Sequence, residues 1–194
     1  TTDDDLVLLA EAVDLLGARA IPAGSAGLAG PLAERWGTHE AARPVLREEA
    51  VRRPLVLVTS HHAVARDQVA ALAELPDVTV VVRGLPAVLA GPDPAAPATG
   101  PVVLASPDDR ADPGLAARIA SALADQAAAW TSAADVPFDA VVLVGGDGAE
   151  AFLRRVGATG VAVRGRLLEG VPDGHIVGGA HDGLTVVTKA GGFG

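Results

Sequence analysis

The sequence has no cysteine and no methionine, and aromatic residues make up only 3% of it. Without cysteine the chain cannot form disulfides, thiolate zinc sites or a thiol nucleophile, although this does not fix the redox compartment. Because 49% of the residues are apolar and few are aromatic, the core must be built from alanine, valine and leucine. Side chains of this kind suit helices packed closely on a buried sheet.

Basic charge is also scarce. The 15 lysine and arginine residues are outnumbered by 24 aspartate and glutamate residues, which gives a formal net charge of −9 at pH 7. No stretch is dense in lysine or arginine, so the electrostatic signature of a nucleic-acid or anionic-membrane binder is missing. We therefore expect neither nucleic acid nor a membrane among the partners.

No apolar run reaches the roughly 18 residues that a membrane-spanning helix needs, and the acidic start Thr1–Asp5 differs from a basic signal peptide. These features predict a cytoplasmic protein. The 194 residues suffice for one domain or at most two small ones. Because the chain lacks an initiator methionine and stops at Phe193-Gly194 without a polar tail, we expect it to be a piece of a longer protein.

Strand and helix patterns alternate along the chain. Apolar runs predict strands at residues 18–22, 54–60, 78–82, 101–105, 140–144, 160–163 and 184–189. Helical spacing predicts helices at residues 5–16, 30–36, 63–75, 113–130 and 149–156. The segments 83–100 and 164–183, rich in glycine or proline, are expected to be loops. This alternation predicts an α/β fold, a three-layer Rossmann-like domain with a mostly parallel sheet.

The strongest candidate site is the glycine turn Val144-Gly145-Gly146-Asp147-Gly148, which joins a buried strand to a helix. In open α/β sheets, ligands bind beyond the carboxyl ends of the strands. Glycines let the backbone approach a phosphate closely, and the free amides and dipole of a helix N-terminus favour negative charge. Asp147 could hold Mg²⁺ through water or accept a hydrogen bond from a ribose hydroxyl. A tight turn and N-cap without a ligand is the alternative.

The same turn also fits a dinucleotide-binding pattern. Residues 146–151 read G-x-G-x-x-A, and the next strand is followed by Arg164 and Arg166, which suit the 2′-phosphate of NADP. An NADP-binding oxidoreductase domain therefore stays open as an alternative. No G-x-x-x-x-G-K-[ST] sequence is present, which excludes a Walker-type phosphate loop.

Two other strand ends carry candidate residues. Ser60 can contact phosphate or serve as the N-cap of the next helix. The adjacent His61 and His62 point apart and lack partners at zinc-binding spacing, so we predict no metal site on protein side chains alone. Lys189 could neutralise phosphate, and Gly191 and Gly192 could let the chain pass over a nucleotide. A surface lysine before a flexible end is the alternative. No serine lies in G-x-S-x-G, so nothing fixes a hydrolase triad.

These segments, in this order, resemble the C-terminal nucleotide-binding domain of the four-carbon acid sugar kinase family. The resemblance rests on TDDDL at 2–6, GSAGLA at 24–29, VLVTS at 56–60, VLVGGDGAEAFLRRVGA at 142–158, EGVPDG at 169–174 and VTKAGGFG at 187–194. It spans the whole chain, so residues 1–194 are expected to form this domain.

The resemblance implies an ATP-dependent kinase that phosphorylates a terminal hydroxyl of a four-carbon sugar acid such as threonate or erythronate. Phosphoryl transfer also requires that the phosphate charge is neutralised, so we expect Mg²⁺ as a cofactor. The resemblance also implies an N-terminal substrate domain outside this chain, without which the fragment is expected to be inactive. By position, Ser60 matches an ATP-contacting serine, Gly145 to Gly148 match the phosphate-binding turn, and Gly191 and Gly192 match the closing glycines. The catalytic base is not identified, and association into a homo-oligomer stays open.

The chain departs from the family pattern at three of these positions. The family usually has glycine before the first serine, threonine five residues after it, and threonine at the end of the glycine turn. This chain has Thr59, Ala65 and Gly148 instead. Such changes fit weaker nucleotide binding or a specialised substrate, and they keep open a non-catalytic regulatory or scaffold domain.

Overall fold

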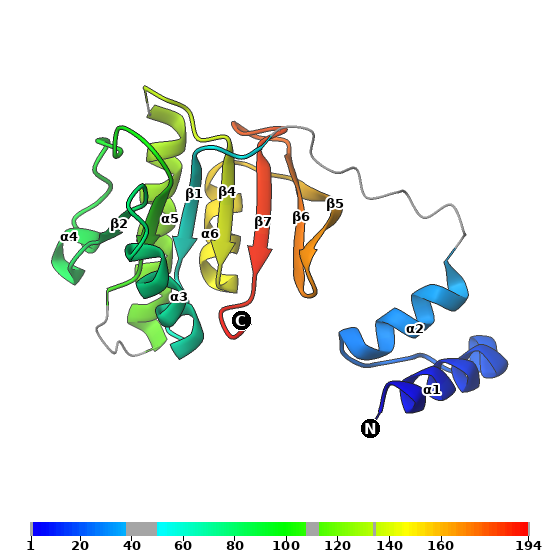
Figure 1. Ribbon diagram of the computed structural model, residues 1–194. Helices are drawn as coiled ribbons and strands as arrows, with labels where there is room; N and C mark the ends of the chain where they lie inside the picture. Colours follow the sequence, from blue (N-terminus) through cyan, green and yellow to red (C-terminus); the bar gives the residue numbers. More distant parts are fainter. Residues whose placement is uncertain (1, 38–49, 108–112, 134, 194) are drawn as a thin grey trace. The chain divides into compact units, whose positions relative to one another are not determined.

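The computed structural model describes residues 2–37, 50–107, 113–133 and 135–193. The chain divides into two compact units, Thr1–Val45 and Leu46–Gly194, whose elements are labelled in Figure 1. None of the helices in these described ranges is both long enough and apolar enough to span a bilayer.

The first unit consists of three helical elements. They are α1 (Asp3–Leu16), the short 3₁₀ helix η1 (Gly17–Arg19) and α2 (Ala26–Trp36). α1 and α2 enclose a small core of Ala10, Leu28 and Leu32. The predicted strand at 18–22 is wrong: η1 occupies its beginning, and the described part of this unit contains no strand with which it could pair. Residues 26–29 belong to α2, which begins earlier than predicted, and Ser25 is its N-cap.

The second unit is built on a seven-stranded sheet with the order β2-β3-β1-β4-β7-β6-β5. The strands are β1 (Pro54–Val58), β2 (Thr79–Val82), β3 (Val102–Ala105), β4 (Ala140–Val144), β5 (Gly160–Leu168), β6 (Val171–Val177) and β7 (Thr185–Lys189). β2, β3, β1, β4 and β7 run parallel, whereas β6 is antiparallel to both of its neighbours. The prediction of a mostly parallel sheet is confirmed.

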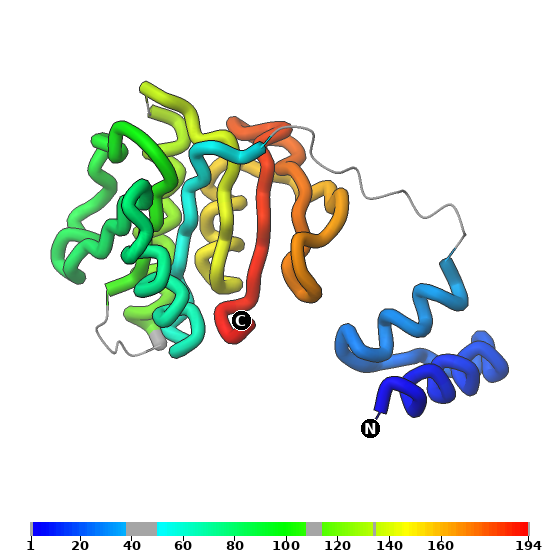
Figure 2. Tube along the Cα trace, in the orientation of Figure 1, coloured from blue at the N-terminus to red at the C-terminus, as the bar shows by residue number. Residues whose placement is uncertain are grey.

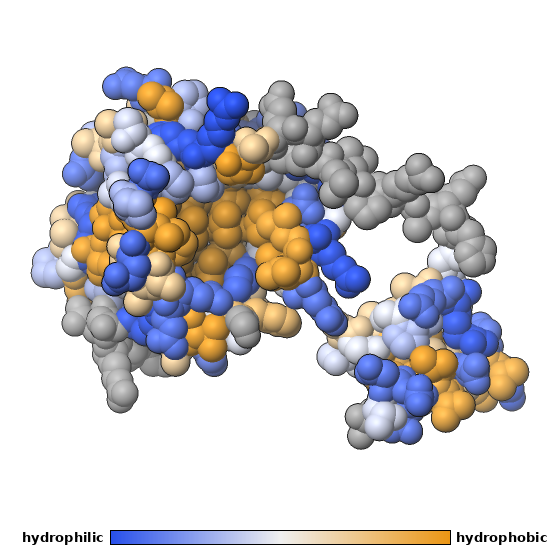
Figure 3. Space-filling model, viewed as in Figure 1, coloured by the Kyte–Doolittle hydropathy of each residue, from blue (hydrophilic) through white to orange (hydrophobic). Residues whose placement is uncertain are grey.

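Helices cover the sheet on two sides. They are α3 (Ala63–Ala73), α4 (Leu85–Leu89), α5 (Pro113–Ala133) and α6 (Gly146–Arg155). α5 and α6 lie on one face and α3 on the other, which confirms the three-layer α/β arrangement (Figure 1). Alternate residues of the strands contribute to two different cores, one on each face of the sheet. For example, Leu143 packs on the side of α5 and α6, and Val144 packs on the side of α3. Figure 3 shows apolar residues gathered on the α3 side, between α3 and the β5–β6 hairpin.

The final third differs from the sequence prediction. Where a loop was expected at 164–183, β5 continues to Leu168 and pairs with β6 as an antiparallel hairpin. The pairing shifts register between Val163 and Gly165 and again between Arg166 and Leu168, which interrupts the alternation of apolar residues. The segment 83–100 contains one short helix, α4, and otherwise no helix or strand.

Candidate functional site

The carboxyl ends of the parallel strands meet at one edge of the sheet, and β1 is the strand where the connection order reverses. After β1 the chain builds β2 and β3 on one side, and it later places β4 on the other side. α3 follows β1 on one face and α6 follows β4 on the opposite face (Figure 1). The chain therefore diverges beyond the ends of β1 and β4, which is where open α/β sheets bind ligands.

The glycine turn after β4 presents three amides without protein acceptors. Gly145 is the N-cap of α6 with a φ of 109°, a conformation that favours glycine, and no side chain caps the helix. The Gly145 N–H donates to the Lys189 carbonyl at 3.0 Å. Within the described ranges, the N–H groups of Gly146, Asp147 and Gly148 have no acceptor, and Gly146 and Asp147 are exposed. These amides and the helix dipole favour an anion.

Thr59 supports the glycine turn from the neighbouring strand end. Its N–H and its Oγ1 donate to the Val144 carbonyl at 3.0 and 3.4 Å. A Cβ added to Gly148 would lie 2.8 Å from the Thr59 Cβ and closer still to the Thr59 Oγ1 and Cγ2. Thr59 thus fills the space that a side chain at 148 would need, and two departures from the family pattern face each other.

The side chains of Val144 and Ala65 are buried in the core on the α3 side of the sheet. The Val144 side chain is 6% exposed and packs in the cluster on the α3 side, so Val144 offers the site its backbone and little side-chain surface. Ala65, the third departure from the family pattern, is 1% exposed in the same cluster. Both residues therefore hold the strand end and α3 in place.

Ser60 meets the segment that follows β7. The Ser60 Oγ accepts a hydrogen bond from the His62 N–H at 3.2 Å. Gly191 crosses directly over it, because a Cβ at position 191 would collide with the Ser60 Oγ and Cβ. A Cβ at Gly192 would lie 3.5 Å from the His62 Nε2. The structure therefore brings Ser60, Gly191 and Gly192 together.

Lys189 is folded back onto the same C-terminal segment. Its Nζ donates to the Phe193 carbonyl and, at 3.3 Å, to the Ala190 carbonyl. Gln68 of α3 donates its Nε2 to the Phe193 carbonyl at 3.1 Å, which holds the chain end beside the start of α3 (Figure 2). For Lys189 to contact a phosphate, its ammonium group would have to exchange these carbonyls for the ligand.

The two histidines after Ser60 have structural roles. His62 is the N-cap of α3, and its Nδ1 accepts from the Val64 N–H at 3.3 Å. The alternative in which Ser60 caps this helix is therefore wrong. The His61 Nδ1 lies 2.9 Å from a guanidinium nitrogen of Arg66. In the described ranges no three histidine or acidic residues come close enough together to hold a metal ion.

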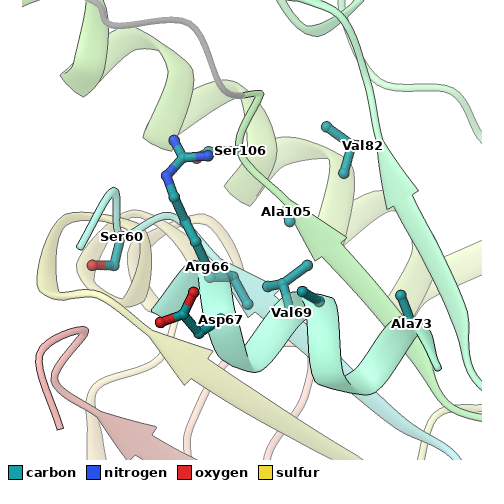
Figure 4. A pocket seen from close by; sticks show the side chains of 10 residues that line it. Ser60, Arg66, Asp67, Val69, Ala73, Val82, Ala105 and Ser106 are labelled. Atoms are coloured by element: carbon teal, nitrogen blue, oxygen red, sulfur yellow. The ribbon is translucent and has the colours of Figure 1, made fainter. Parts of the chain in front are cut away.

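A pocket of about 380 Å³ adjoins Ser60 on the α3 side of the sheet. It lies between α3 and the ends of β1, β2 and β3, and its lining includes Val69, Arg66 and Ser106 (Figure 4). Sequence reasoning missed Ser106, although this serine follows the apolar strand β3 as Thr59 and Ser60 follow β1.

The two arginines that suggested NADP lie away from the glycine turn in the sheet. Arg164 and Arg166 belong to β5, and both β7 and β6 stand between β5 and β4. Arg164 donates to the Gly174 carbonyl at 3.0 Å and to the Thr185 Oγ1 at 3.4 Å. In dinucleotide-binding units the strand after the glycine helix lies beside the first strand. The sheet order thus gives the NADP alternative no support.

Comparison with known proteins defines the class. Residues 55–194 match the family model of the nucleotide-binding C-terminal domain, and the chain belongs to this family. The resemblance to the four-carbon acid sugar kinase family is thereby confirmed.

Individual relatives are more specific. The D-threonate kinase of Bordetella bronchiseptica is 38% identical over 214 residues, covering 99% of this chain and 47% of that protein. A crystal structure from the same organism, of a domain of unknown function with bound citrate as a domain-swapped dimer, is 35% identical with a TM-score of 0.65. The similarity covers 99% of this chain and 48% of that one.

A more distant structure shares the fold. A Haemophilus influenzae protein is 18% identical with a TM-score of 0.67, over 100% of this chain and 49% of its own. The chain thus spans about half the length of the relatives that it matches.

Proposed function

We propose that this chain is the ATP-binding domain of a kinase that phosphorylates a four-carbon sugar acid of the threonate or erythronate type. The observation that carries the proposal is the set of three unpaired amides at Gly146, Asp147 and Gly148, in a member of a nucleotide-binding family. The 38% identity to D-threonate kinase supports the substrate class.

Phosphoryl transfer requires mainly that the phosphates are held, their charge is neutralised and the acceptor is aligned. In this chain the amides of Gly146 to Gly148 would hold phosphate oxygens. Asp147 fits an Mg²⁺ site, because its carboxylate is exposed and has no hydrogen bond or ion pair in the described ranges. Lys189 would add positive charge once it leaves the Phe193 carbonyl, and Ser60 and the glycines at 191 and 192 would border the nucleotide.

The remaining functions would belong to the rest of a longer protein. Because the chain spans about half of the D-threonate kinase relative, we place most of the sugar-acid site and the base for its hydroxyl in an N-terminal substrate domain. The chain alone would then bind nucleotide and phosphorylate nothing. We propose that the full protein self-associates, as the domain-swapped relative does. We also propose that the full protein is cytoplasmic, in keeping with ATP as phosphate donor.

Calorimetric titration with ADP and Mg²⁺ tests the proposal. The variants are Gly146→Val and the matched control Gly160→Val, because a Cβ at either position meets no atom within 4 Å. We expect wild type and Gly160→Val to bind ADP equally, and Gly146→Val to bind at least about tenfold more weakly. Equal binding by Gly146→Val would contradict the site. Binding of NADPH alone would favour an oxidoreductase domain, and binding of neither ligand would favour a non-catalytic domain.

A further inference from the structure

We infer that the pocket beside Ser60 receives the nucleoside part of the nucleotide, its base and ribose, while the glycine turn holds the phosphates. This inference rests on the proposed function and goes one step further, because it assigns a second, separate surface to the same ligand. The pocket lies between α3 and the ends of β1, β2 and β3 (Figure 4).

The walls of the pocket suit a flat aromatic ring. They are formed mainly by small apolar side chains, namely Val58, Val69, Ala70, Ala73, Val82 and Ala105. Val82 is 53% exposed, so apolar surface remains at the rim for a ligand to cover. The volume of about 380 Å³ falls within the range of about 300–1,000 Å³ typical of small-molecule sites.

Ser106 adds a polar group that has no partner. The residue is 8% exposed, and its Oγ is buried without a hydrogen bond to any described residue. A buried hydroxyl that makes no hydrogen bond costs folding free energy, so a ligand atom that pairs with the Ser106 Oγ would be bound favourably. The edge of a nucleobase carries both ring-nitrogen acceptors and amine donors, and a serine hydroxyl can pair with either.

The register of the sheet connects this pocket to the glycine turn. Val58 of β1 pairs with Ala105 of β3 on one side and with Val144 of β4 on the other, so the three strands end at the same level. Adjacent strands are about 4.8 Å apart, which puts the ends of β3 and β4 roughly 10 Å from each other. Ser60, at the end of β1, lies between them and lines the pocket. A ribose with its diphosphate can bridge such a distance.

Arg66 completes the mouth of the pocket. Figure 4 shows its side chain extending from α3 toward the end of β3, where Ser106 lies. A guanidinium plane can stack on an aromatic ring while its edge keeps other hydrogen bonds, such as the one to His61. The pocket thus offers apolar walls, a stacking plane and one hydrogen-bonding hydroxyl.

The test compares ADP with pyrophosphate, both with Mg²⁺, as probes of the whole ligand and of its phosphates alone. Ala70→Phe fills the pocket from an exposed position of α3, and Ala71→Phe is the matched control, because Ala71 is also exposed on α3 and does not line the pocket. We expect Ala70→Phe to weaken ADP binding at least about tenfold and to leave pyrophosphate binding unchanged. Ala71→Phe should bind both ligands like wild type.

A second variant keeps the inference testable if the ring introduced by Ala70→Phe disturbs α3. Ser106→Ala should weaken ADP binding about fivefold, leave pyrophosphate binding unchanged, and leave the unfolding midpoint of the free protein equal or raised. Wild-type ADP affinity in both pocket variants would overturn the inference while the proposed function stands. Equal loss of ADP and pyrophosphate binding in Ala70→Phe would overturn it as well. Failure of the wild-type chain to bind either probe would instead refute the proposed function and the inference with it.

Discussion

Thr59 and Gly148 lie far apart in the sequence and share one space at the glycine turn. Considered separately, each is a departure from the family pattern that suggests weaker nucleotide binding. In the structure the Thr59 side chain occupies the position that a side chain at 148 would take, so the turn stays packed. The sequence could place the turn but not this compensation, because it depends on β1 and β4 being neighbours.

We predict that Gly148→Ala destabilises the protein by about 1–3 kcal/mol through overpacking against Thr59. In a Thr59→Gly background the same change should be neutral or stabilising, because alanine is a better helix former than glycine by about 1 kcal/mol. Urea unfolding of the wild type, both single variants and the double variant measures this coupling. Gly146→Ala, beside open space in the same turn, is the control. An identical cost of Gly148→Ala in both backgrounds would refute the contact.

His181 links the β6–β7 connection to the end of α5. Its Nε2 lies 2.9 Å from the Thr131 Oγ1 and 3.4 Å from the Ser132 Oγ. Burial lowers the pKa of the His181 imidazole below its ordinary value. The folded state therefore binds a proton less readily than the unfolded state, so the stability contributed by this residue is full above the unfolded pKa and is lost as the pH falls below it.

We accordingly expect the urea midpoint to fall when the pH is lowered from about 7.5 to 5.5, across the ordinary histidine pKa. The variant His181→Gln removes the titrating group and should show a smaller fall. Urea titrations of both proteins at the two pH values make the comparison. If the variant loses stability with pH as steeply as wild type, His181 does not cause the effect.

Among the elements, the central strands were the easiest to predict from the sequence. Residues 102–105 are apolar and buried throughout, because helices cover both faces of the sheet. The β5–β6 hairpin lacks such a pattern, since it lies at the edge of the sheet, where much of β5 is exposed and its pairing shifts register twice. The strand prediction at 18–22 is wrong for another reason. A strand needs a neighbouring strand to pair with, and the composition of the segment does not show whether one is present.

Gly174 shows how closely the hairpin is packed. A Cβ at this position would lie 3.1 Å from the Val163 Cα on β5 and would collide with the Ala162 carbonyl. We predict that Gly174→Ala lowers the free energy of unfolding by about 2 kcal/mol or more. Gly160→Ala, at the start of β5 with no atom within 4 Å of the added Cβ, should be nearly neutral. Equal stability of the two variants in urea unfolding would contradict the pairing of β5 with β6.

For the molecule as a whole, sequence reasoning proposed a candidate site at the strand ends, and it left the contacts within that site undetermined. The glycine turn, Ser60 and the glycines at 191 and 192 lie at strand ends, which a parallel sheet places along one edge. The hydrogen bonds of Lys189 to the C-terminal segment and the partnerless hydroxyl of Ser106 depend on tertiary packing. The chain spans about half of its relatives, so the described residues bear on the proposed nucleotide site, and we propose that the acceptor is bound by the rest of a longer protein.

The amide NMR spectrum during titration with ADP and Mg²⁺ tests the central claim most directly. If the turn after β4 holds the phosphates, the N–H signals of Gly146, Asp147 and Gly148 will shift strongly and saturate together with the calorimetric binding curve. A saturating nucleotide that leaves these three signals in place would contradict the account, whatever other residues respond.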